Sequence, residues 1–84
     1  MLYVTFMNII PGNYKSAIKL FKNPVIPEGV KIIRFLGMFG IPDALLIFEA
    51  PNEETAGDFI LQFGDVAELK TSIGIPIKKM RWVQ

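Results

Sequence analysis

Apolar side chains recur along this chain with two different periods, and the change of period marks its elements. Residues 2–9 are rich in β-branched and aromatic types and stop before Pro11-Gly12, so they are predicted to form a strand. Residues 14–22 have helical spacing, with lysines on the opposite side and Asn13 as a candidate N-cap. The apolar positions of this predicted helix are Tyr14, Ala17, Ile18 and Phe21.

The second half of the chain repeats this alternation of strand and helix. Residues 30–38 and 44–50 are predicted strands, joined by a hairpin that Gly37, Gly40 and Pro42 punctuate. Asn52 is a candidate N-cap for a helix whose apolar positions are Ala56, Phe59, Ile60 and Phe63. A further short turn through Val66 and Leu69 is expected next, and then a last strand over residues 70–80.

This order, βαββαβ, predicts a single α+β domain over residues 1–84. Short connections and right-handed crossovers give a ferredoxin-like, four-stranded antiparallel sheet of order 4-1-3-2, with both helices on one face. Pro76 in the last predicted strand supports this order, because proline is tolerated on edge strands. Mid-strand charges fall on the two predicted edges, as exposed edges require. They are Lys31, Arg34, Lys70 and Lys78.

Both central strands are apolar on both sides, and this is the main anomaly of the pattern. The first strand has Leu2, Val4 and Phe6 on one side and Tyr3, Thr5, Met7 and Ile9 on the other. The third strand has Ala44, Leu46 and Phe48 on one side, and Leu45 and Ile47 followed by Glu49 on the other. Two helices cover one face and leave an open face of roughly 400 Å², which matches or exceeds the apolar patch that a soluble monomer normally shows. We therefore expect a homodimer, or a higher homo-oligomer, through the helix-free face. The alternative is a monomer whose open face Thr5, Arg34 and Glu49 keep wet.

Composition excludes several kinds of chemistry. The chain has no cysteine and no histidine, which removes disulfides, thiolate catalysis, the usual general base and the common transition-metal ligands. No metal site and no cofactor are expected. The formal net charge of +1 argues against nucleic acid, and no apolar stretch is long enough for a membrane span. Without a signal-like N-terminus or cysteines, a cytoplasmic location is the expectation.

Several turn and cap motifs resemble those of a family of small proteins known only as a domain of unknown function. The shared motifs are residues 11–13, 27–31, 49–50 and 63–65. Residues 48–56 are also similar to the corresponding stretch of GYD-type domains. Both resemblances imply a dimeric α+β barrel, in which two ferredoxin-like sheets pack face to face, and neither implies an established activity. Where the first family usually has Gly-Arg-Trp-His, this chain has residues 34–37 as Arg-Phe-Leu-Gly.

Four side chains are candidates for a ligand site on the face away from the helices. Arg34 and Glu49 are expected to lie roughly opposite each other there, with Tyr3 and Thr5 sharing the same face. Such a set suits a bound anion or a general base. The structural alternatives are an ion pair for the first two and a barrel-lining aromatic for Tyr3.

A second cluster, near the C-terminus, combines basic side chains with an aromatic one. It consists of Lys78, Lys79, Arg81 and Trp82. Such residues could stack on a nucleic-acid strand, but the central strands have no matching aromatic motif, which favours a solvated edge strand and tail.

Two classes of function follow for the predicted assembly. The first is a ligand-binding or interaction module that holds a small apolar or amphipathic molecule in a cavity between packed sheets. The alternative is a cofactor-free enzyme of the monooxygenase or isomerase kind, with Arg34, Glu49 and Tyr3 in polar roles. This alternative rests on fold analogy, and the absence of histidine counts against it.

Overall fold

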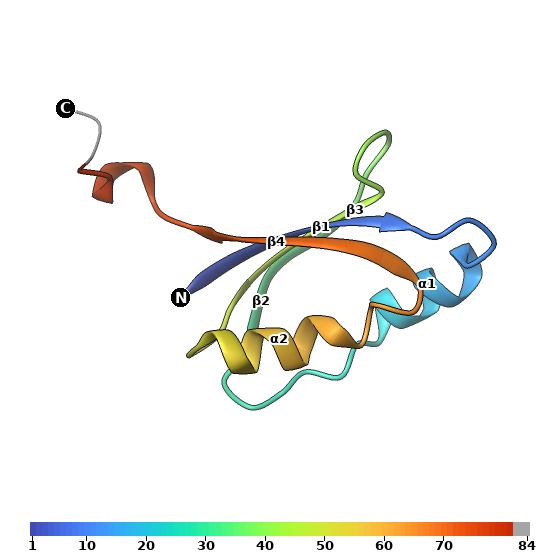
Figure 1. Ribbon diagram of the computed structural model, residues 1–84, viewed down its shortest axis with the longest axis horizontal. Coiled ribbons are helices and arrows are strands. Elements are labelled where there is room, and N and C mark those ends of the chain that lie inside the picture. Colours follow the sequence, from blue (N-terminus) through green and yellow to red (C-terminus); the bar gives the residue numbers. More distant parts are fainter. Residues whose placement is uncertain (82–84) are drawn as a thin grey trace.

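The computed structural model describes residues 1–81, which form one antiparallel sheet with two helices packed on one side (Figure 1). The elements are β1 (Leu2–Ile9), α1 (Tyr14–Lys22), β2 (Lys31–Gly37), β3 (Ala44–Glu49), α2 (Glu53–Leu61), β4 (Ala67–Gly74) and a 3-10 turn, η1 (Ile77–Lys79). Neither helix within these residues is long and apolar enough to cross a membrane.

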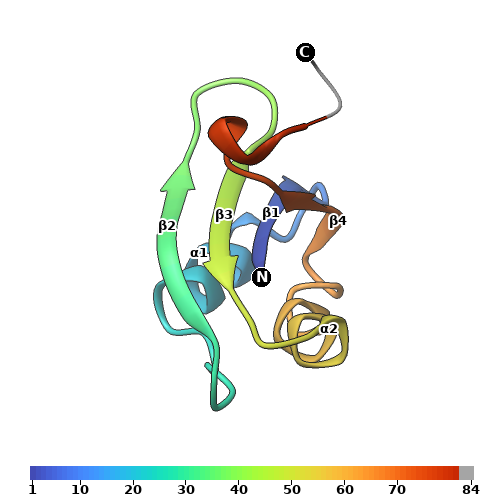
Figure 2. The ribbon, with the colours of Figure 1, turned by 90° about the vertical axis from the view of Figure 1, so that its left-hand side faces the viewer.

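The sheet has the predicted topology. Its strand order is β2-β3-β1-β4, which is the expected 4-1-3-2 counted from the other edge, and all three pairings are antiparallel (Figure 2). Because both crossovers carry a helix to the same side, the ferredoxin-like βαββαβ fold is confirmed.

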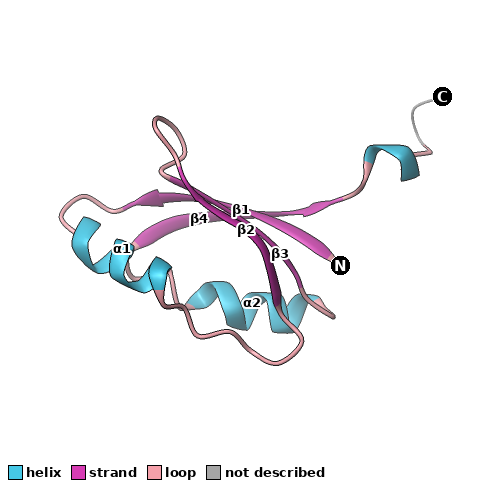
Figure 3. Ribbon diagram, turned by 180° about the vertical axis from the view of Figure 1, so that it is seen from behind, coloured by secondary structure: helices cyan, strands magenta, loops and turns pink. Residues whose placement is uncertain are grey.

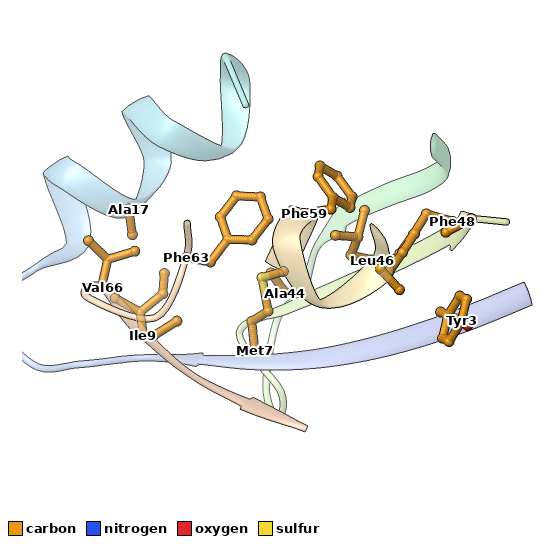
Figure 4. Close-up of a cluster of buried hydrophobic side chains, with 13 residues drawn as sticks. Tyr3, Met7, Ile9, Ala17, Ala44, Leu46, Phe48, Phe59, Phe63 and Val66 are labelled. Carbon is orange, nitrogen blue, oxygen red and sulfur yellow. The ribbon is translucent and has the colours of Figure 1, made fainter. Parts of the chain in front are cut away.

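The core lies between the sheet and the helices. Phe59 of α2 contacts Phe48 of β3 edge to face, with ring centroids 5.0 Å apart, and Phe63 follows at 5.8 Å from Phe59 (Figure 4). Tilted and edge-to-face aromatic contacts add stability beyond the area that they bury. The predicted apolar stripe of the second helix is thus confirmed, although Phe63 lies in the turn that follows the helix.

The last strand begins and ends earlier than predicted. Ala67 already pairs with Ile9, and Gly74 pairs with Leu2, the first residue of β1. A strand can extend only as far as its neighbour offers backbone partners, so β4 ends at Gly74 and includes Leu69, where a helical turn was expected. Pro76 therefore lies beyond the strand, before η1. The predicted strand order is right, but Pro76 is not evidence for it.

The first helix packs through a different stripe from the one predicted. Ala17 is fully buried, and Leu20 and Phe21 pack against the core, whereas Tyr14 and Ile18 are exposed. The Asn13 side chain makes no cap to this helix; its amide donates to the carbonyl oxygen of Asp65 instead, at 3.2 Å. The Asn13 side chain thus bonds to a carbonyl group just before β4, and not to an N–H group of α1.

The second predicted cap is confirmed. The Asn52 Oδ1 atom accepts a hydrogen bond from the Thr55 backbone N–H at 2.8 Å, and Glu53 and Glu54 stand in the first turn of α2. This cap satisfies one of the free N–H groups at the start of a helix, and the two carboxylates favour the helix dipole.

Candidate functional site

The helix-free face of the sheet has an apolar centre. Residues that pair across antiparallel strands share a face, so the register assigns every side chain to a side. The apolar side chains of the helix-free face are Leu2, Val4, Phe6, Leu36, Leu45 and Ile47. Phe6, in the middle of the sheet, keeps an exposed fraction of 46% and Leu36 one of 43%. We call these six residues the open-face cluster.

Polar side chains border the open-face cluster. Lys31 and Arg34 of β2 lie along one edge, Lys70 and Ser72 of β4 along the other, and Glu49 at the end of β3. An apolar centre with a polar rim is the usual composition of a protein–protein interface. The face therefore has the composition of a contact surface.

A bulge places Arg34 on this rim. Lys31 pairs with Glu49 and Ile32 with Phe48, but Arg34 pairs with Ile47, so Ile33 is an extra residue. A bulge of one residue reverses the alternation of side chains beyond it. Without it, Arg34 would lie on the same side as Ile32, under the helices.

Arg34 and Glu49 share the helix-free face, as the sequence predicted, but they are not cross-strand partners. Glu49 lies opposite Lys31, and Arg34 opposite Ile47. Within residues 1–81 the structure shows no ion pair between the two. The geometry thus leaves both charged groups accessible from the helix-free side.

The prediction that Tyr3 and Thr5 share this face is wrong. Both lie on the helix-covered side, where Tyr3 stacks on Phe48 with ring centroids 5.3 Å apart. The Thr5 hydroxyl is fully buried and shares a 2.8 Å hydrogen bond with the hydroxyl of Thr71. Thr5 therefore cannot make the open face wetter, and the four candidate residues do not converge on one site.

Two apolar projections that the sequence pattern did not predict rise on the helix-free side. One is the β2–β3 hairpin, residues 38–43, and the other is the tail that continues β4 into η1 (Figures 1 and 3). Phe39 has an exposed fraction of 111% and Ile41 one of 93%, and Ile75 and Ile77 of the tail are exposed as well. Glycine and proline identified residues 37–42 as a turn. Turn residues are normally polar, so Phe39 and Ile41 within this turn were the signal that could have predicted an exposed apolar projection.

Only the base of the hairpin is fixed to the sheet. Asp43 accepts a hydrogen bond from the Ile9 backbone N–H through Oδ2 at 2.8 Å, and its carbonyl oxygen accepts one from Met38 N–H at 2.9 Å. The carboxylate thus takes the place of a strand partner just before β3 begins at Ala44. It holds the hairpin in position at this end of the open-face cluster.

A hollow lies at the opposite end of the same face. It measures about 340 Å³ between the end of β1, the end of β3 and the tail. Its walls include Met1, Leu2, Ile73, Ile75 and Pro76, with Glu49 and Lys79 as its charged members. The described residues 1–81 contain no group of three acidic side chains that could hold a metal ion there or elsewhere.

The basic-aromatic cluster is only partly described. Lys78 and Lys79 lie exposed in η1, Arg81 follows, and Trp82 falls outside the described residues. A sheet that binds single-stranded RNA stacks bases on aromatics of its central strands. Phe6 is the one aromatic residue that β1 and β3 place on the helix-free face, so the open face offers no such platform.

No protein-family model and no curated protein matches this chain.

Proposed function

We propose that this chain works as a homodimer whose helix-free faces pack together and enclose a small apolar or amphipathic molecule. The observation that supports the proposal is the open-face cluster with its polar rim. Two-fold pairing of identical patches is the commonest way in which a chain covers such a face. The resemblance of its turn motifs to families expected to form dimeric barrels agrees with this arrangement.

The energetics of the contact are close to balance. Phe6 and Leu36 are nearly half exposed, and the other four members of the cluster are less so. Covering Phe6 and Leu36 alone would contribute roughly 4 kcal/mol per subunit, or roughly 8 kcal/mol for two, and the other four members add to this. Association costs about 4–15 kcal/mol. The cluster therefore supports a dimer with little margin, and contacts at its ends would decide the affinity.

The ligand space in this proposal lies toward the corners of the contact. Twisted sheets that pack face to face stay close along their middle and separate toward their corners. Arg34 and Glu49 stand at the border of the cluster, where a charged or polar head group could meet them. An apolar body would then lie against the open-face cluster.

Mass measurement across a concentration series tests the dimer. Light scattering after size-exclusion chromatography is expected to give twice the subunit mass of 9.5 kDa at micromolar concentration. Phe6→Lys puts two charges into the centre of the contact and is expected to give monomers that stay folded by circular dichroism. Leu61→Lys is the matched control, since this exposed residue lies in the helix layer. A wild-type monomer at every concentration would refute the proposal.

Titration with a fluorescent fatty acid tests the ligand. The wild-type dimer is expected to bind it, and Phe6→Lys to lose binding. Arg34→Gln is expected to weaken it about tenfold, because a charge-assisted hydrogen bond is worth about 1.5 kcal/mol or more. If the protein is a dimer but binds neither this probe nor an uncharged apolar dye, the ligand part of the proposal is wrong, and the dimer is an interaction module only.

No specific observation favours the cofactor-free enzyme. That hypothesis needs Arg34, Glu49 and Tyr3 around one substrate, and Tyr3 lies on the other side of the sheet.

A further inference from the structure

We propose that the hairpin tip of one subunit, Phe39 with Ile41, inserts into the hollow at the far end of the open face of a second copy. This inference rests on the proposed homodimer and specifies how the two faces are aligned. It starts from the most unusual surface in the described structure, two large apolar side chains that meet almost nothing in their own subunit.

The tip and the hollow are complementary in character. Phe39 and Ile41 offer two apolar side chains on a loop that rises away from the helices (Figure 3). The hollow is lined mainly by apolar residues, among them Leu2, Ile75 and Pro76. An apolar cavity of about 150 Å³ accepts a benzene ring, so the hollow of about 340 Å³ has room for the Phe39 ring and part of Ile41.

Their positions in the sheet determine the symmetry. The hairpin leaves the sheet beside Met7, and the hollow lies around Leu2, at the other end of β1. A two-fold axis parallel to the strands would superpose like ends, so that each tip meets the other tip and both hollows stay open. An axis across the strands superposes opposite ends. Each tip then reaches the partner's hollow, and both contacts form at once.

This second arrangement also stacks like strands on each other. The tip joins β2 to β3, and Glu49 at the end of β3 is one of the residues that line the hollow. When β3 lies over β3, the tip therefore meets the hollow at its β3 side, from which the hollow continues across the ends of β1 and β4. The two insertions add apolar contact at the ends of a face whose centre alone barely offsets the cost of association.

The absence of cysteine makes the alignment directly testable by cross-linking. Phe39→Cys and Ile75→Cys each introduce a single thiol, and the two variants are co-expressed with different tags and treated with a short thiol-specific linker. The mixed pair is expected to give a covalent dimer in high yield, and each variant alone a much lower yield. Phe39→Cys with Ile26→Cys is the control, because Ile26 is an exposed residue of the loop between α1 and β2, and this loop runs on the helix side (Figure 1).

Three outcomes are informative. Cross-linking of Phe39→Cys alone, as efficient as that of the mixed pair, would show tip against tip and overturn the inference. A wild-type dimer by light scattering with no Phe39–Ile75 cross-link would overturn it too, while the proposed homodimer stands. A wild-type monomer would remove both.

A binding measurement supplements the cross-link. Phe39→Asp is expected to raise the dimer Kd by at least about 100-fold, because both ends of the contact lose their anchor at once. Ile26→Asp, an equally drastic change on an exposed apolar residue of the helix side, is expected to leave Kd within about twofold. An unchanged Kd for Phe39→Asp would contradict the insertion.

Discussion

The two faces of the sheet belong to the same strands and carry similar side chains, but the helices cover only one of them. On the helix-covered face, Phe48 is fully buried beneath Phe59 and stacked on Tyr3. On the helix-free face, Phe6 keeps nearly half of its surface exposed. Apolar residues on both sides of a central strand are typical of a sheet that is covered on both faces, and the described residues cover only one of them.

The largest difference between the two faces should appear in unfolding. Phe59→Ala is expected to lower the free energy of unfolding by about 3–5 kcal/mol, because it leaves a cavity among closely packed rings. Phe6→Ala removes a ring that is half exposed and should cost about 1 kcal/mol in a dissociated subunit. Urea denaturation followed by circular dichroism, at the lowest practical protein concentration, measures both. Equal losses would mean that the two faces are equally packed in the single subunit.

A contact through the helix-free face should instead make the stability of the protein depend on its concentration. If the dimer forms, unfolding is coupled to dissociation, and stability rises by about 2.7 kcal/mol when the partner stands at 100 times its Kd. The urea midpoint of the wild-type protein is thus expected to rise with concentration, and that of Phe6→Lys to stay constant. Phe59→Ala, although weaker overall, should keep the concentration dependence. A wild-type midpoint that does not move would count against the dimer.

The sequence predicted β1 with its observed limits because that strand is an uninterrupted β-rich run that ends at a proline and a glycine. It could not predict where β4 begins, since Ala67 to Leu69 join the sheet only because β1 offers them partners. Strand limits set by a distant neighbour leave no local signal. The bulge at Ile33 is of the same kind, since nothing in the local sequence requires it.

The assignment of Tyr3 and Thr5 failed for a different reason. Alternation shows which residues share a face, but when both faces are apolar it does not show which face the helices will cover. Arg34 and Glu49 lie on the predicted face, since charges under the helices would be buried without partners, but they are not opposite each other, and Arg34 reaches this face only through the bulge at Ile33. Tyr3 and Thr5 are amphipathic enough to fit either side, and each found a structural partner under the helices.

Asp43 offers a way to disturb the hairpin without touching the open-face cluster. Asp43→Ala removes the acceptor of the Ile9 N–H bond and is expected to cost about 2 kcal/mol of stability, since the acceptor is charged and partly buried. Asp43→Asn keeps an acceptor oxygen and should lose less than half of that. If the hairpin tip takes part in the dimer, Asp43→Ala should also weaken association, measured by light scattering on dilution. Full stability in Asp43→Ala would show that the hairpin base is held by its backbone bonds alone.

The smallest expected effect concerns the one polar residue buried on the covered face. Thr5→Val keeps the shape of the side chain and removes the hydroxyl that bonds to Thr71, so a loss of about 1 kcal/mol is expected. The double variant Thr5→Val/Thr71→Val should cost no more than the single one, because neither hydroxyl then lacks its partner. Binding of the fluorescent fatty acid should be the same in all three proteins, since Thr5 lies on the opposite side from Arg34. If a variant is fully stable but no longer binds the probe, Thr5 belongs to the ligand site, and that site lies under the helices.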